Sequence, residues 1–280
     1  MDVSEKRDAL WVRQKNEIIQ RSGNILTALQ NKALLFCISQ VDSINDEPDT
    51  LYTISTLELC RVCGLTNDWY NKTIKDIFKK LLTPLAFIRG NDGKEIPLTW
   101  ISPDDFVLDN VNNTVTFKFT KQVSFFLYKL KVKYTEFKLI NGVVLKSKYA
   151  ISLYQLLKSY ERMESHRASF ELEQLKKALG VLYTADKDGN ICSIKDGGEW
   201  IDIYPRYYDF EKRALKPAVD EINKACDITV SYEVGERTPR RKPKNIIFTI
   251  LPKNPFEDPE GVRRMKEEQN RRLNPDDTKK

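Results

Sequence analysis

The stretch that decides the fold runs from Tyr204 to Ile250, "YPRYYDFEKRALKPAVDEINKACDITVSYEVGERTPRRKPKNIIFTI". From Tyr207 to Lys224 it has the periodicity of an amphipathic helix. The core face of this helix consists of Phe210, Ala214, Leu215, Ala218 and Ile222. Two alternating strand patterns follow, "ITVSYEV" and "NIIFTIL", which predict a hairpin. A helix that leads into such a hairpin is typical of a winged helix-turn-helix domain, whose third helix enters the major groove of DNA.

Both elements carry positive charge. Away from the core face of the helix lie Lys212, Arg213, Lys216 and Asn223, with Arg206 near its N-terminal end. The hairpin tip places five cations within eight residues, Arg237, Arg240, Arg241, Lys242 and Lys244. Such side chains bond guanine edges and phosphates. Solvated surface residues are the alternative for either element alone, but two basic elements on one surface favour DNA. Pro217, inside the helix, predicts a bend.

A weak internal repeat extends this pattern to the rest of the chain. Upstream of the decisive stretch lie the helical segments "SKYAISLYQLLKSYE" and "SFELEQLKKALGV", with Ser169 as the predicted N-cap of the latter. The first copy has "LTALQNKALLFCISQV", then "STLELCRVCG" with N-cap Ser55, then "NDWYNKTIKDIFKKLL". The strand patterns "AFIRG", "EIPLTWIS" and "NTVTFKFT" follow. Setting Gly64 on Gly180 aligns the two copies, each glycine closing a helix.

These patterns predict an α+β fold of two tandem winged helix-turn-helix domains. Residues 1–140 form the first domain, with secondary DNA contacts, and 141–252 form the second, the main DNA reader. Residues 253–280 form a polar tail. In the third helix of the first domain, the candidate DNA contacts are Asn67, Asn71, Lys72 and Lys75. The connector 121–146 predicts a helix and a short packed segment, and the Asp/Gly-rich insert around 184–200 predicts an exposed loop.

Composition permits a polyanionic partner and limits the other possibilities. The 280 residues carry a net charge of +6. No apolar run reaches the roughly 18 residues that span a membrane, and we expect a cytoplasmic protein without membrane contact. Five scattered cysteines argue against a disulfide framework. Cys60 and Cys63 form a lone CxxC, but His166 is the only histidine, so reduced, partly buried thiols are expected and no metal or cofactor.

Catalytic motifs are missing from the sequence. The only Gly-Lys pair, Gly93-Lys94, precedes Glu95 and therefore does not complete a P-loop. One histidine cannot supply the metal-holding pair of a rolling-circle nicking enzyme, nor a Ser/His/Asp set. We therefore expect a binding protein rather than an enzyme. A winged-helix transcriptional regulator and an origin-nicking or priming enzyme are the alternatives.

Several segments resemble the iteron-binding plasmid replication initiator proteins. The resemblance is carried by "LKSKYAISLYQLLKSYE", "FELEQLKKALGV" and the stretch from Tyr204 onward. It covers about residues 16–252 and is most specific from Tyr149 to Ile250. It implies two winged-helix domains that bind repeated origin sequences in double-stranded DNA as a monomer and initiate replication. It also implies a dimer, paired through the first domain, that represses the chain's own promoter, and recruitment of the host initiator and helicase. The insert between Gly180 and Tyr204 departs from the family pattern.

Overall fold

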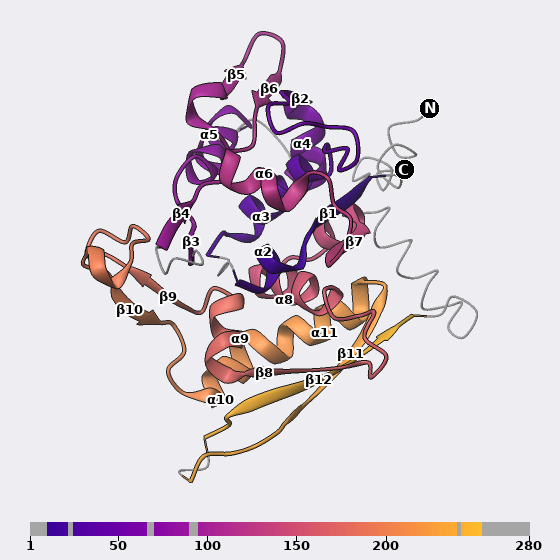
Figure 1. Cartoon of the computed structure of the whole chain (residues 1–280), viewed down its shortest axis with the longest axis vertical. Coiled ribbons are helices and arrows are strands. Elements are labelled where there is room, and N and C mark those ends of the chain that lie inside the picture. The colour runs from indigo at the N-terminus through magenta and orange to yellow at the C-terminus, as the bar shows by residue number, and fades with distance from the viewer. Residues whose placement is uncertain (1–9, 22–24, 66–69, 90–94, 240–241, 254–280) are drawn as a thin grey trace, which may run out of the picture.

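The computed structural model describes residues 10–21, 25–65, 70–89, 95–239 and 242–253, and it contains the same order of elements twice (Figure 1). The upper copy in Figure 1 comprises α3 (Ala28–Ile38), β2 (Tyr52–Ser55), α4 (Thr56–Cys63), α5 (Tyr70–Leu81), β5 (Val107–Asp109) and β6 (Thr114–Phe117). The lower copy comprises α8 (Lys148–Lys158), β8 (Arg167–Glu171), α9 (Leu172–Ala178), α10 (Tyr207–Phe210), η3 (Glu211–Leu215), α11 (Lys216–Ala225), β11 (Ile228–Val234) and β12 (Asn245–Pro252).

The sheets of the two copies share one topology. In the first, β2 pairs antiparallel with β6, and β6 pairs with β5. In the second, β8 pairs antiparallel with β12, and β12 pairs with β11. Each sheet therefore joins the strand before the second helix to the hairpin that ends the copy. Both copies are winged-helix domains, as the repeat predicted.

Local signals account for several element boundaries. The hydroxyl of Ser55 accepts a hydrogen bond from the backbone N–H of Glu58 at 3.4 Å and caps α4. Gly64 and Gly180 both have left-handed backbone, with φ of 71° and 64°. A glycine adopts this conformation at a helix end without the clash that a Cβ causes. The alignment of the two glycines is therefore confirmed.

Ser169 is not a helix cap. It lies inside β8, opposite Ile247, and its hydroxyl accepts a hydrogen bond from the Asn245 side chain at 2.8 Å. Helix α9 starts three residues later, with Glu171 in the N-cap position. Cross-strand pairing with β12 extends the strand through the position that the local cap signal marked. The predicted cap at Ser169 is therefore wrong.

Two strand pairs were not predicted. The connector forms α6 (Lys121–Leu127), the expected helix, and then β7 (Tyr134–Lys138) and α7 (Leu139–Val143). Strand β7 pairs antiparallel with β1 (Trp11–Lys15), which leads into α2 (Asn16–Arg21). The insert is not a simple loop, because β9 (Leu182–Ala185) and β10 (Glu199–Asp202) form an antiparallel hairpin around a short 3-10 turn, Ile194–Asp196. A smaller hairpin joins β3 (Ala86–Arg89) to β4 (Glu95–Leu98), and a 3-10 turn spans Pro103–Asp105.

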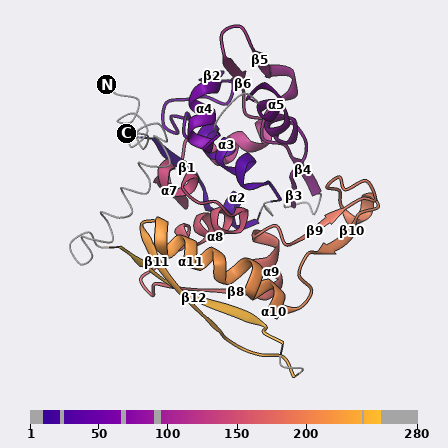
Figure 2. The ribbon, with the colours of Figure 1, turned by 180° about the vertical axis from the view of Figure 1, so that it is seen from behind.

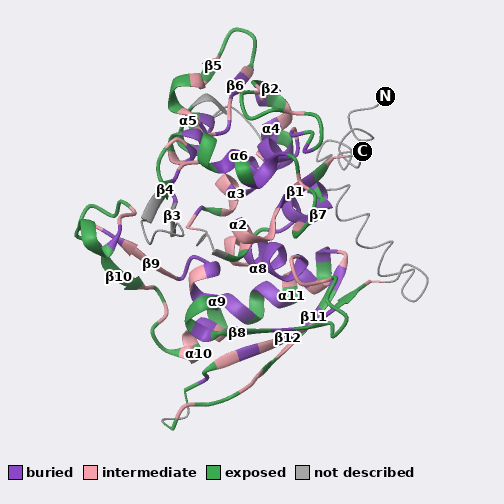
Figure 3. Ribbon diagram, viewed as in Figure 1, coloured by how far each residue is buried: buried purple, intermediate pink, exposed green. Residues whose placement is uncertain are grey.

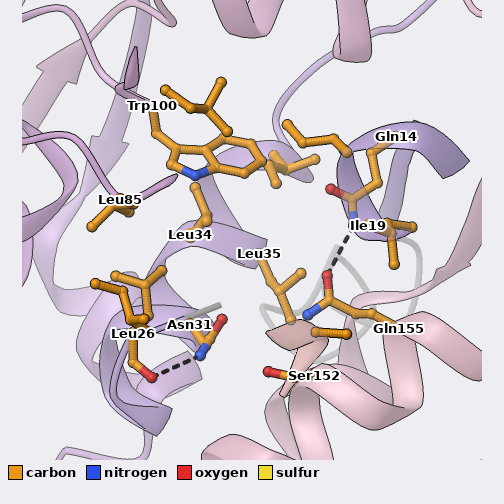
Figure 4. A pocket seen from close by; sticks show the side chains of 15 residues that line it. Gln14, Ile19, Leu26, Asn31, Leu34, Leu35, Leu85, Trp100, Ser152 and Gln155 are labelled. Carbon is orange, nitrogen blue, oxygen red and sulfur yellow. Dashed lines mark hydrogen bonds between the residues drawn. The ribbon is translucent and has the colours of Figure 1, made fainter. Parts of the chain in front are cut away.

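The apolar core is continuous across the two domains. Buried residues concentrate in α3, α8 and α11, whereas the β11–β12 hairpin is largely exposed toward its tip (Figure 3). At the junction the side chain of Gln14 donates a buried hydrogen bond to Gln155 at 2.9 Å. A pocket beside this bond is lined by Leu34 and Trp100 from the first domain and by Ser152 from α8 (Figure 4). Seen from behind, the β9–β10 hairpin and strand β1 lie on opposite sides of the molecule (Figure 2). Among the described helices, none has both the length and the apolar character that crossing a membrane requires.

Candidate nucleic-acid interface

The third helix of the second domain is built as the periodicity predicted. Elements α10, η3 and α11 follow one another without a break, and the junction residues Glu211 and Lys216 keep right-handed helical backbone. The predicted core face is buried, with Phe210, Leu215, Ala218 and Ile222 at 0% exposure and Ala214 at 1%. The opposite side of the helix is therefore the side that can meet a ligand.

Pro217 has a visible structural counterpart. The five residues Glu211–Leu215 form a π-helical turn directly before α11, in which Pro217 is one of the first two residues. A proline inside an α-helix lacks the N–H that would bond the carbonyl four residues earlier, and its ring crowds that carbonyl. A π-helical turn opens the hydrogen-bond ladder at this point and turns the preceding residues relative to α11.

The cations of this helix are exposed. Lys212, Arg213 and Lys216 all lie at the surface. Lys216 pairs with Asp220 at 3.0 Å, and Arg206 pairs with Asp209 at 2.6 Å; both lysine and arginine side chains remain more than half exposed. Such pairs contribute little stability, so they can exchange for phosphate contacts. Three cations thus stay available on the outer side of the helix.

Asn223 has a different role from the one predicted. Its side-chain N–H donates to the Val230 carbonyl at 2.8 Å, and its oxygen accepts from the Val230 N–H at 2.6 Å. The amide therefore replaces a strand partner at the start of β11 and holds the wing to the helix. Both polar atoms are occupied, which removes Asn223 from the set that we propose for DNA contact.

The wing continues the hairpin toward a basic tip. Beyond β11 and β12 the backbone N–H of Lys244 bonds the Glu236 carbonyl, and that of Thr238 bonds the Lys242 carbonyl, both at 2.8 Å. Arg237, Lys242 and Lys244 are exposed. A hydrogen bond of 2.9 Å between Lys244 and Glu236 lowers the pKa of Glu236 and raises that of Lys244. Arg240 and Arg241 lie outside the described residues.

The first domain presents fewer of its predicted contacts. Lys72 and Lys75 are exposed on α5, while Ile74, Ile77 and Leu81 are buried beneath them. Asn71 belongs to α5, although its side chain is not described, and Asn67 lies outside the described residues. Two lysines on the equivalent helix provide a smaller charged surface than the helix and wing of the second domain.

Lys176 positions the start of the third helix, and sequence reasoning missed it. Its side chain is 4% exposed, and its ammonium donates to Asp202 at 2.8 Å and to the Tyr204 carbonyl at 2.6 Å. It also lies 5.7 Å from the centre of the Phe210 ring. These contacts tie α9 to the segment that enters α10. A lysine beside another lysine in "EQLKKALG" gave no sequence signal of burial.

Two tyrosines fix the helix against the wing. The hydroxyls of Tyr207 and Tyr232 both donate to one Glu211 carboxylate oxygen, at 3.1 and 3.2 Å. Burial and the nearby Glu211 charge raise the pKa of Tyr232 to about 12. The three side chains therefore connect α10 and η3 to β11.

The CxxC thiols lie in the core of the first domain. Burial raises the pKa of Cys60 to about 11 and that of Cys63 to about 12. Neither cysteine is in a disulfide. Within the described residues there is no group of three or more His, Cys, Asp or Glu side chains placed to hold a metal ion. The structure therefore offers thiols that resist ionisation, consistent with a packing role.

An exposed basic third helix beside a basic wing, in a chain whose two domains share the winged-helix topology, defines a winged-helix protein of the DNA-binding type. The chain belongs to the initiator replication protein family. The family model described as "Initiator Replication protein, WH1" matches residues 11–158, and "Initiator Rep protein, WH2" matches residues 199–250. Residues 159–198, which include α9 and much of the β9–β10 hairpin, fall between the two matches.

Two comparisons connect the chain to a characterised relative. It is 26% identical over 263 residues to the PI protein of Escherichia coli, covering 86% of this chain and 82% of that protein. It is also similar to a solved structure described as the Pi initiator protein in complex with iteron DNA. That match has a TM-score of 0.69 and 22% identity, and covers 88% of this chain and 99% of the other. The described part of the chain thus has the fold of two winged-helix domains found in this family.

Proposed function

We propose that the chain binds double-stranded DNA at repeated origin sites, or iterons, and thereby initiates plasmid replication. The observation that carries this proposal is that Arg213 and Lys216 are exposed on the third helix and that Glu211 and Tyr232 join this helix to the basic wing that follows it. Family membership and the iteron DNA bound by the Pi initiator support the same assignment.

Each element has its own task in this proposal. The third helix enters the major groove, where arginine and lysine bond the N7 and O6 atoms of guanine. The wing follows the flanking backbone, where flexible cations hold phosphate or enter the minor groove. The first domain adds contacts from Lys72 and Lys75 in a neighbouring part of the site. Because the two domains pack through a shared core, they meet the DNA with a defined spacing.

The proposal includes partners that the resemblance implies. The bound chain recruits the host initiator and helicase, and acts in the cytoplasm through binding, without chemistry of its own. A dimer, paired through the first domain, represses the chain's own promoter. We propose residues 1–140 and 141–252 as the two functional units, followed by a polar tail.

Footprinting on the DNA that flanks the chain's own gene tests the proposal. We expect protection of several equally spaced copies of one sequence. With about six phosphates neutralised, the plot of log affinity against log salt should have a slope of about −5. Protection of a single promoter site would favour the transcriptional regulator instead. A slope near zero between roughly 50 and 200 mM salt would contradict an extended backbone contact.

A second assay addresses the enzymatic alternative. The purified chain, with Mg²⁺ or Mn²⁺, is incubated with a supercoiled plasmid that carries the protected sites. We expect the plasmid to stay supercoiled. Conversion to nicked circles by the wild type, in proportion to protein added, would show that the chain cuts its origin.

A matched pair of charge variants tests whether the footprint depends on the third helix or only on the net charge of the chain. The control uses the β9–β10 hairpin, which lies away from the tip of the wing (Figure 1). The loop of this hairpin carries Lys187 and Lys195, which are both exposed. Replacing both with alanine removes as much charge as the double change Arg213→Ala and Lys216→Ala. We expect loss of protection from the helix variant only. Equal losses would assign binding to net charge rather than to the helix.

A further inference from the structure

Tyr208 is an aromatic residue with an exposed ring on the first turn of the third helix. It is 63% exposed, whereas its neighbour Tyr207 is half-buried and bonded to Glu211. Within the described residues, the only side chain that bonds the Tyr208 hydroxyl or lies over its ring as a cation is Lys212, from the same helix. Tyr207 therefore helps to hold the wing through Glu211, whereas the Tyr208 ring is left exposed.

A single exposed aromatic needs no special explanation, but the position of this one is informative. Tyr208 and Lys212 are spaced four residues apart on the helix. The ammonium of Lys212 lies 5.6 Å from the centre of the Tyr208 ring and 3.5 Å from its hydroxyl. The ring thus lies beside Lys212, one of the cations proposed to contact DNA, at the N-terminal end of the helix, where recognition helices contact base edges.

We propose that Tyr208 is a specificity-determining residue that contacts the C5 methyl group of a thymine in the major groove. This inference rests on the proposed function. The thymine methyl is the apolar group that base pairs present in that groove, and it is matched by apolar side-chain surface. The ring supplies this surface, while Lys212, held at its hydroxyl, is directed to a neighbouring acceptor on the same DNA.

Uracil substitution tests the contact directly, because it deletes the methyl group and keeps the base pair. Thymines in a footprinted site are replaced one at a time, and the affinity of each duplex is measured. For the wild type we expect a position at which uracil weakens binding about fourfold, the value for burying one methyl-sized group. Tyr208→Ala should bind the thymine duplex more weakly and show no further loss with uracil there.

Two further variants separate the ring from its hydroxyl and from exposed aromatics in general. Tyr208→Phe keeps the ring and should keep the uracil effect. Trp200→Ala removes a ring that is 54% exposed on β10, and it should also keep the uracil effect. Thermal melting should be unchanged in Tyr208→Ala, because the ring packs on little of the protein.

The outcomes are distinct. A wild type with no uracil-sensitive position, or a Tyr208→Ala variant that keeps the wild-type uracil effect, would overturn the methyl contact. So would equal losses in Tyr208→Phe and Tyr208→Ala, which would assign the effect to the hydroxyl. If the wild type showed no preference for any site over scrambled DNA, the proposed function itself would fail.

Discussion

Arg213 and Lys216 illustrate how two exposed cations on one helix can differ. Lys216 is paired with Asp220, whereas Arg213 has no hydrogen bond or ion pair within the part of the chain that is described. Arginine also presents a planar fork that bonds guanine in a bidentate manner. Of the two side chains, Arg213 is therefore the one better prepared to read a base.

We predict that Arg213→Ala reduces sequence discrimination by about 1–3 kcal/mol, the value of one good bidentate base contact. Lys216→Ala should reduce it less, because the lysine must first leave Asp220. The measurement is the affinity ratio between a cognate and a scrambled duplex at two salt concentrations. A loss from Arg213→Ala that is equal on both duplexes would make this side chain a phosphate contact.

Asn223 and Lys176 show why single residues of the site are hard to predict. Both are polar residues in helical patterns, and such residues are usually solvated. The Asn223 amide is instead hydrogen-bonded to the backbone of Val230. The Lys176 ammonium is hydrogen-bonded to a carboxylate and a carbonyl 26 to 28 residues away. Helix periodicity gives the direction of a side chain, but not the partner that tertiary packing brings to it.

We predict that Asn223→Ala lowers the free energy of unfolding by about 1–3 kcal/mol, because it leaves buried backbone groups of Val230 without partners. The base preference of the folded variant should remain that of the wild type. Urea unfolding and the cognate-to-scrambled ratio measure the two effects. Lys212→Ala, an exposed change on the same helix, is the stability control. A stable Asn223→Ala protein with altered base preference would return this residue to the DNA-contact set.

The thiols lead to a pH prediction. Cys63 has its pKa raised by burial from 9.0 to about 12, so the unfolded chain loses this proton first. Its contribution to stability is therefore complete below pH 9 and is lost as pH rises toward 12, at about 1.4 kcal/mol per pH unit. The Cys63→Ala variant has no thiol at this position, so its stability lacks this loss at high pH. The stability difference between wild type and variant, from urea midpoints at about pH 8 to 10.5, should shrink above pH 9. A constant difference would mean that the thiol is not protected by burial.

At the scale of elements, prediction succeeded where a pattern was local. The helix from Tyr207 and the strands of the wing alternate buried and exposed residues in the expected periods. Strand β10 has no such alternation, since Glu199, Trp200 and Ile201 are all exposed, and its hairpin was not predicted. Strand β1 pairs with β7, more than 110 residues later in the sequence, and no local turn signal indicates a pairing over so long a separation.

The wing carries the fourth prediction. Replacing Arg240, Arg241 and Lys242 with alanine removes three phosphate-binding charges and should flatten the salt slope by roughly 3 units. Specific and non-specific affinity should fall by similar factors, because phosphate contacts carry little sequence information. The melting temperature should not change, because exposed charges contribute little to stability. If this variant instead lost its preference for cognate over scrambled DNA, the wing would be the element that recognises the base sequence.

At the scale of the whole molecule, the repeat predicted two domains but not how closely they join. Substitutions on either side of this junction should lower stability, because α2 and α3 of the first domain pack against α8 of the second. The packing is also close at Gly142, where an added Cβ would lie 2.7 Å from the Leu35 side chain and would force it to shift. Contacts of this kind follow from three-dimensional packing, which a one-dimensional repeat does not contain.

The junction therefore leads to a final prediction, that the two domains unfold together. Removing the amide of Gln155 by Gln155→Ala leaves the buried Gln14 without its partner and should cost about 1–3 kcal/mol. Because the core is shared, amide exchange should accelerate by the same factor in α5 of the first domain and in α11 of the second. Calorimetry should show one transition at a lower temperature. Gln20→Ala is the control, since its bond to Ser159 is exposed and its loss should change neither measurement. Faster exchange in one domain alone, or two separate transitions, would show that the domains are independent and that their spacing on DNA is not set by the fold.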